Sequence, residues 1–166
     1  MIFVVRRRGS VRMRMDNCGA RGHDLHAAVM TLPGKGKTMN RTIQTDKAPP
    51  SFSAYSQAVE VPANARTVHV SGQVGAQADG RIPEDPETQH VLAWRNVFAI
   101  LEAAGMAKTD IVDVFAIVTS QEGVKTFREV RDRMFDGHLA CSTIIIAGLA
   151  SPDWKIEIAV KAAKVD

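Results

Sequence analysis

Apolar and polar positions alternate through residues 153–163, which read DWKIEIAVKAA. Ile156, Ile158 and Val160 fall on one side of an extended chain, and Glu157 falls on the other. This period of two predicts a strand with one buried face. Glu157 is then either an ordinary solvent-side residue or a carboxylate held at the mouth of a site.

The same periodicity predicts four further strands. Residues 55–61 alternate and stop at Pro62, and residues 66–72 follow after a short turn, so we expect these two strands to form a hairpin. Residues 110–120 and 142–149 are apolar at nearly every position. Such runs are typical of strands that are covered on both faces.

Two segments carry a helical period instead. Asp85 followed by Pro86 is a typical helix start, and the helix should run to about Ala104, before Gly105. Its apolar stripe consists of Val91, Trp94, Phe98 and Leu101. A second helix is expected over residues 121–136, with Gly137 as its stop and a buried side formed by Phe127, Val130 and Met134.

The predicted order is therefore β-β-α-β-α-β-β, an α+β fold with two helices on one face of a mixed sheet. Two helices cannot cover both faces of such a sheet. The segments FAIV and IIIA would then leave a large apolar patch on the open face. The pattern alone thus predicts a homo-oligomer that buries its sheet faces.

Charge divides the chain of 166 residues into two parts. Residues 1–38 carry eight Lys and Arg against two Asp, whereas residues 39–166 carry 13 Lys and Arg against 16 Asp and Glu. The leader is therefore at +6 and the body at −3, which argues against nucleic-acid binding by the body. No apolar run approaches the length of a membrane span. The two cysteines, Cys18 and Cys141, lie far apart in the sequence, so we expect no disulfide and a reducing, cytoplasmic location.

The basic leader, residues 1–38, is predicted to be a flexible tail or a mis-assigned start, with the domain at 39–166. Its four apolar residues precede the arginines, which does not match a secretory signal. Cys18, His23 and His26 are too few and too irregularly spaced for a metal site. A transit peptide, or a tail that touches RNA or anionic lipid, stays open as an alternative.

The body lacks the common hydrolase and nucleotide-binding motifs, among them G-x-S-x-G, H-E-x-x-H, the Walker loop and C-x-x-C. From the residues alone, Tyr55 is a packed strand aromatic and Ser71-Gly72 is a turn at a strand end. Cys141 is a small buried thiol, although His138 three residues earlier suggests a thiolate–imidazole pair. Contact with a ligand is the alternative for each, and we expect neither a metal nor a cofactor.

Six segments of the body occur in an order and spacing that resemble the Rid family (RidA, YjgF, also labelled L-PSP endoribonuclease or translation inhibitor). These segments are AYSQAV, VHVSGQVG, RNVFAILEAAG, DIVDVFAIVT, FREVRDRMF and KIEIAV, within about residues 45–165. The resemblance implies a chorismate-mutase-like fold and a homotrimer with sites in clefts between subunits. It also implies that the family's site tyrosine is Tyr55, that its strand-end serine is Ser71, next to Gly72, and that its water-positioning glutamate is Glu157.

One position departs from the family pattern. Deaminating members hold the substrate carboxylate with an arginine just before the fourth strand, where this chain has Cys141, or Ser142 if the alignment shifts by one. A bidentate guanidinium contact contributes about 1.5–3 kcal/mol, or roughly 10- to 150-fold in affinity. We therefore expect a poor deaminase for 2-aminoacrylate-type imines. Lys155 or an arginine of a neighbouring subunit could replace the missing cation, whereas Arg66 has the wrong parity on its strand.

Three functions follow from these observations. The first is a Rid-like protein that binds, and hydrolyses with the help of Glu157, a small imine, carbonyl or amide metabolite. The second is a trimer that binds or senses a small molecule without turnover. The third is the ribonuclease or translation inhibitor of the older family label, against which the net charge of the body argues.

Overall fold

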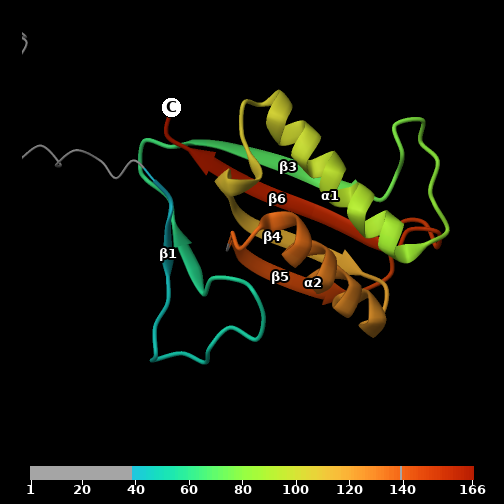
Figure 1. Cartoon of the computed structure of the whole chain (residues 1–166), viewed down its shortest axis with the longest axis horizontal. Coiled ribbons are helices and arrows are strands. Elements are labelled where there is room, and N and C mark those ends of the chain that lie inside the picture. The colour runs from blue at the N-terminus through green and yellow to red at the C-terminus, as the bar shows by residue number, and fades with distance from the viewer. Residues whose placement is uncertain (1–38, 139) are drawn as a thin grey trace, which may run out of the picture. The chain divides into compact units, whose positions relative to one another are not determined.

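The computed structural model describes residues 39–138 and 140–166 (Figure 1). The predictions for the leader, residues 1–38, lie outside the described residues. The elements are the strands β1 (Arg41–Ile43), β2 (Ala58–Glu60), β3 (Arg66–Val74), β4 (Ile111–Val118), β5 (Cys141–Ile146) and β6 (Ile156–Lys164), with the helices α1 (Pro86–Ala103) and α2 (Gln121–Phe135). A single 3₁₀ turn, η1 (Lys108–Asp110), precedes β4.

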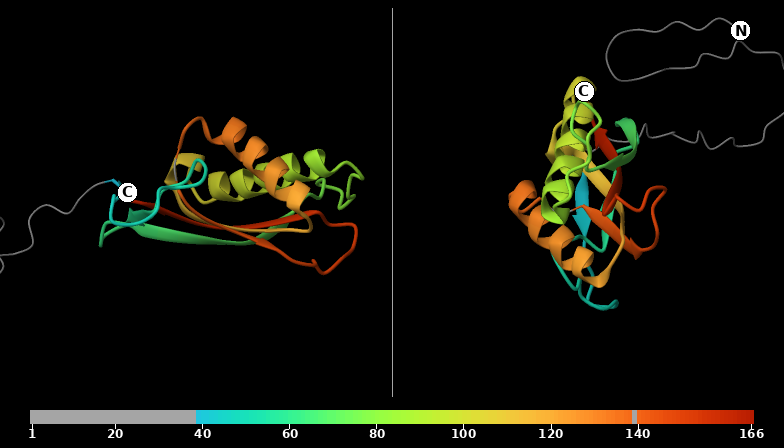
Figure 2. Two further views of the ribbon diagram at one scale, coloured as in Figure 1. Left: turned by 90° about the horizontal axis from the view of Figure 1, so that it is seen from below. Right: turned by 90° about the vertical axis from the view of Figure 1, so that its right-hand side faces the viewer.

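Four of the strands form a mixed sheet in the order β3-β6-β4-β5. β6 runs antiparallel to β3 and β4, and β4 runs parallel to β5. α1 packs on β3 and β6, α2 packs on β4 and β5, and both helices lie on the same side of the sheet (Figure 2). The predicted α+β fold with two helices on one sheet face is thus confirmed.

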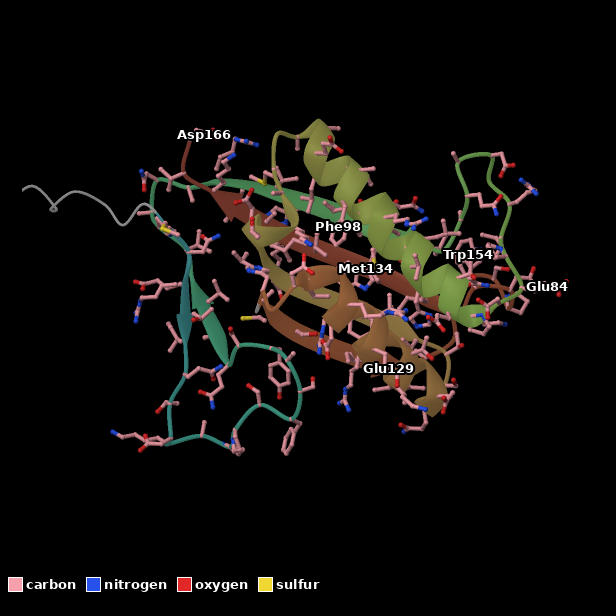
Figure 3. The ribbon with its side chains drawn as sticks, viewed as in Figure 1. Glu84, Phe98, Glu129, Met134, Trp154 and Asp166 are labelled. Carbon is pink, nitrogen blue, oxygen red and sulfur yellow. The ribbon has the colours of Figure 1, made fainter. Side chains whose placement is uncertain are left out.

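The core lies between the sheet and the helices. Ile156, Ile158 and Val160 of β6 are buried, as their alternation predicts. Trp94 of α1 and Phe127 of α2 pack above them, with ring centroids 5.9 Å apart. Figure 3 shows Phe98 and Met134 where the two helices meet, and both pack against the core as partly buried side chains.

Side-chain caps fix where the helices begin. The Asp85 carboxylate accepts a 2.8 Å hydrogen bond from the Thr88 N–H, and the Ser120 hydroxyl accepts one of 3.0 Å from the Gly123 N–H. α1 ends at Ala103, one residue before the predicted position, and Gly105 follows with a φ of +70°. The local signals in the sequence were therefore sufficient to place both helices.

The predicted hairpin between residues 55–61 and 66–72 is wrong. β2 pairs instead with β1, a short strand that the periodicity of the sequence does not predict, and the Arg41–Glu60 ion pair of 2.7 Å joins them. β3 pairs with β6 along nearly its whole length. The longer ladder with β6 offers β3 many more backbone hydrogen bonds than the three-residue β2 could supply.

The second face of the sheet, here named the open face, carries no helix among the residues that the structure describes. Phe115 of β4 and Ile145 of β5 are 40% and 42% exposed on it, although the sequence predicted these strands to be covered on both faces. Residues 39–138 and 140–166 thus cover one face of the sheet only. In the part of the chain that the structure describes, neither helix is long and apolar enough to cross a membrane.

Candidate functional site

Ser71 and Gly72 form a bulge in β3. Val70 pairs with Val160 of β6 and Gln73 pairs with Ile158, so two residues of β3 oppose one residue of β6. The Gln73 side-chain amide donates 3.2 Å hydrogen bonds to the carbonyl oxygens of Ser71 and Gly72, which holds the irregular backbone in place. Both bulge residues are exposed.

Glu157 places its carboxylate directly against this bulge. A methyl group added to Gly72 would lie 1.8 Å from Oε1 of Glu157, so the absence of a side chain at Gly72 makes room for the carboxylate. Val74 of β3 and Ile117 of β4 are the register partners of Glu157. Among residues 39–138 and 140–166, no side chain donates a hydrogen bond to this half-buried carboxylate and no Lys or Arg pairs with it. Its oxygens are therefore available to accept a proton from water or from a ligand.

Tyr55 lies in the loop that leads into β2, beside the opposite edge of the sheet. The Phe52 N–H donates a 3.3 Å hydrogen bond to the Tyr55 hydroxyl. The buried Ser56 donates its N–H to the carbonyl oxygen of Ala140, 3.0 Å away, which ties the loop to the residue before β5. Tyr55 is therefore grouped with the start of β5 and not with the bulge.

Cys141 and Ser142 lie on opposite faces of β5. Cys141 pairs with Asp113 and shares the open face with it, whereas Ser142 pairs with the buried Val114 and its hydroxyl is buried without a partner among the described residues. Of the two positions that the sequence offers for the missing arginine, only 141 faces the open side. Burial raises the pKa of the Cys141 thiol, and the nearby Asp113 charge raises it further, so the thiol is neutral at pH 7.

The structure thus divides the predicted site into two parts. The first, here named the Glu157 half-site, consists of Ser71, Gly72 and Glu157. The second, the Tyr55 half-site, consists of Tyr55 and Cys141. Glu157 is level with Ile145 on β5, two strands away, and Cys141 precedes Ile145 by four residues. Strand spacing and rise then place the Cα atoms of Glu157 and Cys141 about 16 Å apart, too far to hold one small molecule within a single chain.

A polar row crosses the open face, and the sequence did not predict it. His69 of β3, Lys161 of β6 and Asp113 of β4 are register partners, and the Lys161 ammonium donates a 2.8 Å hydrogen bond to the Asp113 carboxylate. These three residues line a depression of about 270 Å³. Asp113 stands within the apolar run DIVDVFAIV, and that break in the run was the available signal.

Lys155, which the sequence suggested as a replacement cation, lies away from position 141, and so does Arg66, which the sequence argued against. The Lys155 ammonium donates to the Pro152 carbonyl oxygen at 2.6 Å, and Lys155 precedes β6. Arg66, at the far end of β3, forms an ion pair with Asp166 at 3.0 Å. In the part of the chain that the structure describes, no three His, Cys, Asp or Glu side chains group as metal ligands would.

Comparison with known proteins places this arrangement in a family. Residues 45–164 match the family model described as Endoribonuclease L-PSP. The chain is 34% identical over 125 residues to TdcF of Escherichia coli strain K12, covering 72% of this chain and 94% of that protein. It is 32% identical, again over 125 residues, to the 2-iminobutanoate/2-iminopropanoate deaminase of the same strain, with the same coverage.

Solved structures agree with the sequence matches. The Rid-family protein YyfB of Yersinia pestis superposes with a TM-score of 0.66 at 28% identity, covering 74% of this chain and 97% of that chain. E. coli TdcF with bound serine gives 0.56 at 30% identity, covering 75% and 98%. The chain therefore belongs to the Rid family, the family of the L-PSP model, as the resemblance in the sequence indicated.

Proposed function

We propose that this protein binds a small imine, carbonyl or amide metabolite and that Glu157 positions the water that hydrolyses it. The observation that carries the proposal is the contact between the Glu157 carboxylate and the bare backbone of Gly72, on an exposed bulge. The family relatives named as deaminases, and the relative solved with serine, support a small-molecule ligand. A cytoplasmic location fits this function, because a reducing compartment keeps Cys141 as a thiol.

The complete site requires two copies of the chain. The Glu157 half-site and the Tyr55 half-site lie on separate parts of one chain. The open face between them exposes apolar side chains, so we expect another copy of the chain to cover it. We expect a homotrimer in which the open faces pack together, and in which the Tyr55 half-site of one copy meets the Glu157 half-site of its neighbour. Each cleft between subunits then contains one whole site.

The chemistry proposed for an imine uses Glu157 as the base. The carboxylate accepts a proton from water as the water oxygen forms a bond to the imine carbon, and the C=N electron pair moves to nitrogen, which takes that proton back from Glu157. Glu157 then transfers the hydroxyl proton of the carbinolamine to the same nitrogen, so the C–N bond breaks and ammonia leaves as the carbonyl forms. Ser71, one of the two bulge residues, would donate a hydrogen bond to the ligand.

A standard 2-aminoacrylate-type deaminase is not expected from this site. Position 141 faces the open side with a neutral thiol, where a deaminating relative would place a cation. A ligand carboxylate next to it would lose roughly 1.5–3 kcal/mol of charge-assisted hydrogen bonding. The ligand is therefore neutral at that point, or carries its charge elsewhere.

Two other functions have an observation in their favour. The missing cation at position 141 favours a trimer that binds or senses a small molecule without turnover. The description of the matching family model favours a ribonuclease, but the body carries a net charge of −3. RNA affinity that disappears with residues 1–38 would belong to the leader and not to this site.

The test compares the wild-type protein with Glu157→Gln, which keeps the shape of the side chain and removes its basicity. Both are screened for hydrolysis of small neutral imines and amides and for binding of small ketones, and Glu122→Gln on the exposed surface of α2 is the matched control. We expect hydrolysis by the wild type and by the control, and a loss of at least about 100-fold in Glu157→Gln. A wild type that binds but never hydrolyses supports the binding protein instead. Equal activity in Glu157→Gln would rule out the role of this carboxylate.

A further inference from the structure

Arg131 of α2 is a buried cation that is only partly paired. Its side chain is 5% exposed, and the guanidinium lies 5.7 Å from the centre of the Phe127 ring. Nε and Nη2 both donate to one oxygen of Asp132, at 2.9 and 2.8 Å. Among the described residues, no acceptor lies within hydrogen-bond distance of Nη1.

An unpaired guanidinium nitrogen in a buried position is costly, because it has lost water and gained no acceptor. The Asp132 carboxylate occupies the Nε side of the guanidinium, so the edge formed by Nη1 and Nη2 is left for another acceptor. Besides Asp132, the Ser53 hydroxyl is the one described group that accepts a hydrogen bond from the guanidinium, and its distance of 3.5 Å from Nη2 makes a weak contact. This edge has the geometry that binds the two oxygens of a carboxylate.

The open edge of Arg131 points to the loop of the Tyr55 half-site. Ser53 precedes Tyr55 by two residues, so their Cα atoms lie within about 8 Å. Ser56 in turn binds the carbonyl oxygen of Ala140, which adjoins Cys141. The guanidinium thus approaches the half-site from α2, behind the loop, and not from position 141.

We propose that Arg131 binds the anionic group of the ligand, in place of the arginine that position 141 lacks. The ligand would be a small carbonyl or imine compound whose carboxylate is separated from the reactive carbon by further carbon atoms. A 2-keto or 2-imino acid would be too short, because its carboxylate would lie beside Cys141. The proposal rests on the proposed function of the site and names the class of its ligand.

Two features of α2 bear on access to this cation. Glu129, on the exposed side of the helix (Figure 3), is two residues from Arg131 and therefore about 200° around the helix axis, so its charge faces away. Asp132 is half exposed, which lets water screen its charge.

The loop at residues 49–56 forms neither helix nor strand, and its Phe52 side chain is 81% exposed. A small displacement of Ser53 would therefore admit a carboxylate to the open edge.

The test measures binding of three probes to the full chain by calorimetry: 4-oxopentanoate, the neutral ketone 2-pentanone and pyruvate. We expect wild type to bind 4-oxopentanoate about 10- to 100-fold more tightly than either of the others. Arg131→Met should abolish this preference while 2-pentanone binding stays the same. Arg128→Met, which removes the same charge from the exposed surface of α2, is the matched control and should keep the preference.

Arg131→Lys retains the charge without the planar fork and serves if the methionine variant does not fold, as judged by circular dichroism. We expect it to lose most of the preference. A preference that survives both substitutions, or a wild type that binds pyruvate as tightly as 4-oxopentanoate, overturns the inference. If wild type binds 2-pentanone without favouring the acid, the proposed function stands and only the role of Arg131 fails. If none of the three probes binds, the proposed function and the role of Arg131 are both contradicted.

Discussion

At the scale of single residues, the site depends on an absent side chain. Gly72 has no positive φ that would require glycine, so its identity is explained by space and not by backbone conformation. The Glu157 carboxylate occupies the volume that a Cβ atom would fill. Gly72 and Glu157 therefore work as a pair, in which the first residue sets the position of the second.

Replacing Gly72 with alanine should displace that carboxylate. The side chain of Glu157 is flexible and can swing away, so we expect stability to fall by less than about 1 kcal/mol. Hydrolysis or ligand binding should fall roughly 10- to 100-fold, because the base leaves its position. Activity and thermal unfolding of Gly72→Ala, measured side by side, check this.

Two other glycines provide controls. A Cβ at Gly148 meets no atom within 4 Å, so Gly148→Ala should change neither stability nor activity. A Cβ at Gly75 would lie 2.4 Å from the backbone of Gln89 in α1, so Gly75→Ala should lower stability by about 1–3 kcal/mol. If Gly72→Ala behaves like Gly148→Ala in every measurement, the position of the carboxylate does not matter.

At the scale of elements, α1 has a buried histidine that makes its packing depend on pH. His90 is fully buried, and its Nδ1 lies 2.7 Å from the Pro86 carbonyl oxygen, to which it can donate. Burial lowers the pKa of His90 below its usual 6.5, against the smaller opposing effects of the Pro86 and Gly123 backbone and the Glu87 charge. The folded protein therefore binds this proton less readily than the unfolded chain does.

The free energy of unfolding should consequently fall as the pH drops below 6.5, by at most about 1.4 kcal/mol per pH unit until the folded pKa is reached. Urea unfolding of wild type and His90→Gln between pH 7.5 and pH 5 measures this free energy. Carboxylates titrate in both proteins, so their contributions cancel in the difference between the two free energies of unfolding. The prediction is wrong if the free energy of unfolding changes with pH in the same way in wild type and in His90→Gln.

The sequence predicts elements better than it predicts their pairing. Both helices and β6 follow from local periodicity and caps, which a short window of residues contains. The predicted hairpin failed because strand pairing is decided by competition between distant partners, and the three-residue β1 has no periodicity to reveal it.

The candidate site, too, could be predicted only in part from the sequence. Tyr55, Ser71 and Glu157 could be named from the resemblance to the family, but the contact between Gly72 and Glu157 depends on a bulge that leaves no mark in the sequence. Arg131 was missed although it follows Phe127 by four residues and so interrupts the apolar stripe of α2. A charged residue at such a position is the one signal that could have been followed.

At the scale of the whole molecule, the open sheet face is expected to hold the subunits together. Covering the exposed part of Phe115 removes roughly 80 Å² from water, which contributes about 2 kcal/mol per subunit. Phe115→Lys should therefore convert the oligomer to monomers, measured by light scattering after size-exclusion chromatography. Because the monomer separates the two half-sites, the same variant should lose its activity without losing its fold.

Ile100→Lys is the matched control: Ile100 is 39% exposed on α1, outside the open face, and its replacement should leave both assembly and activity unchanged. An active Phe115→Lys monomer would show that one chain forms the whole site by itself.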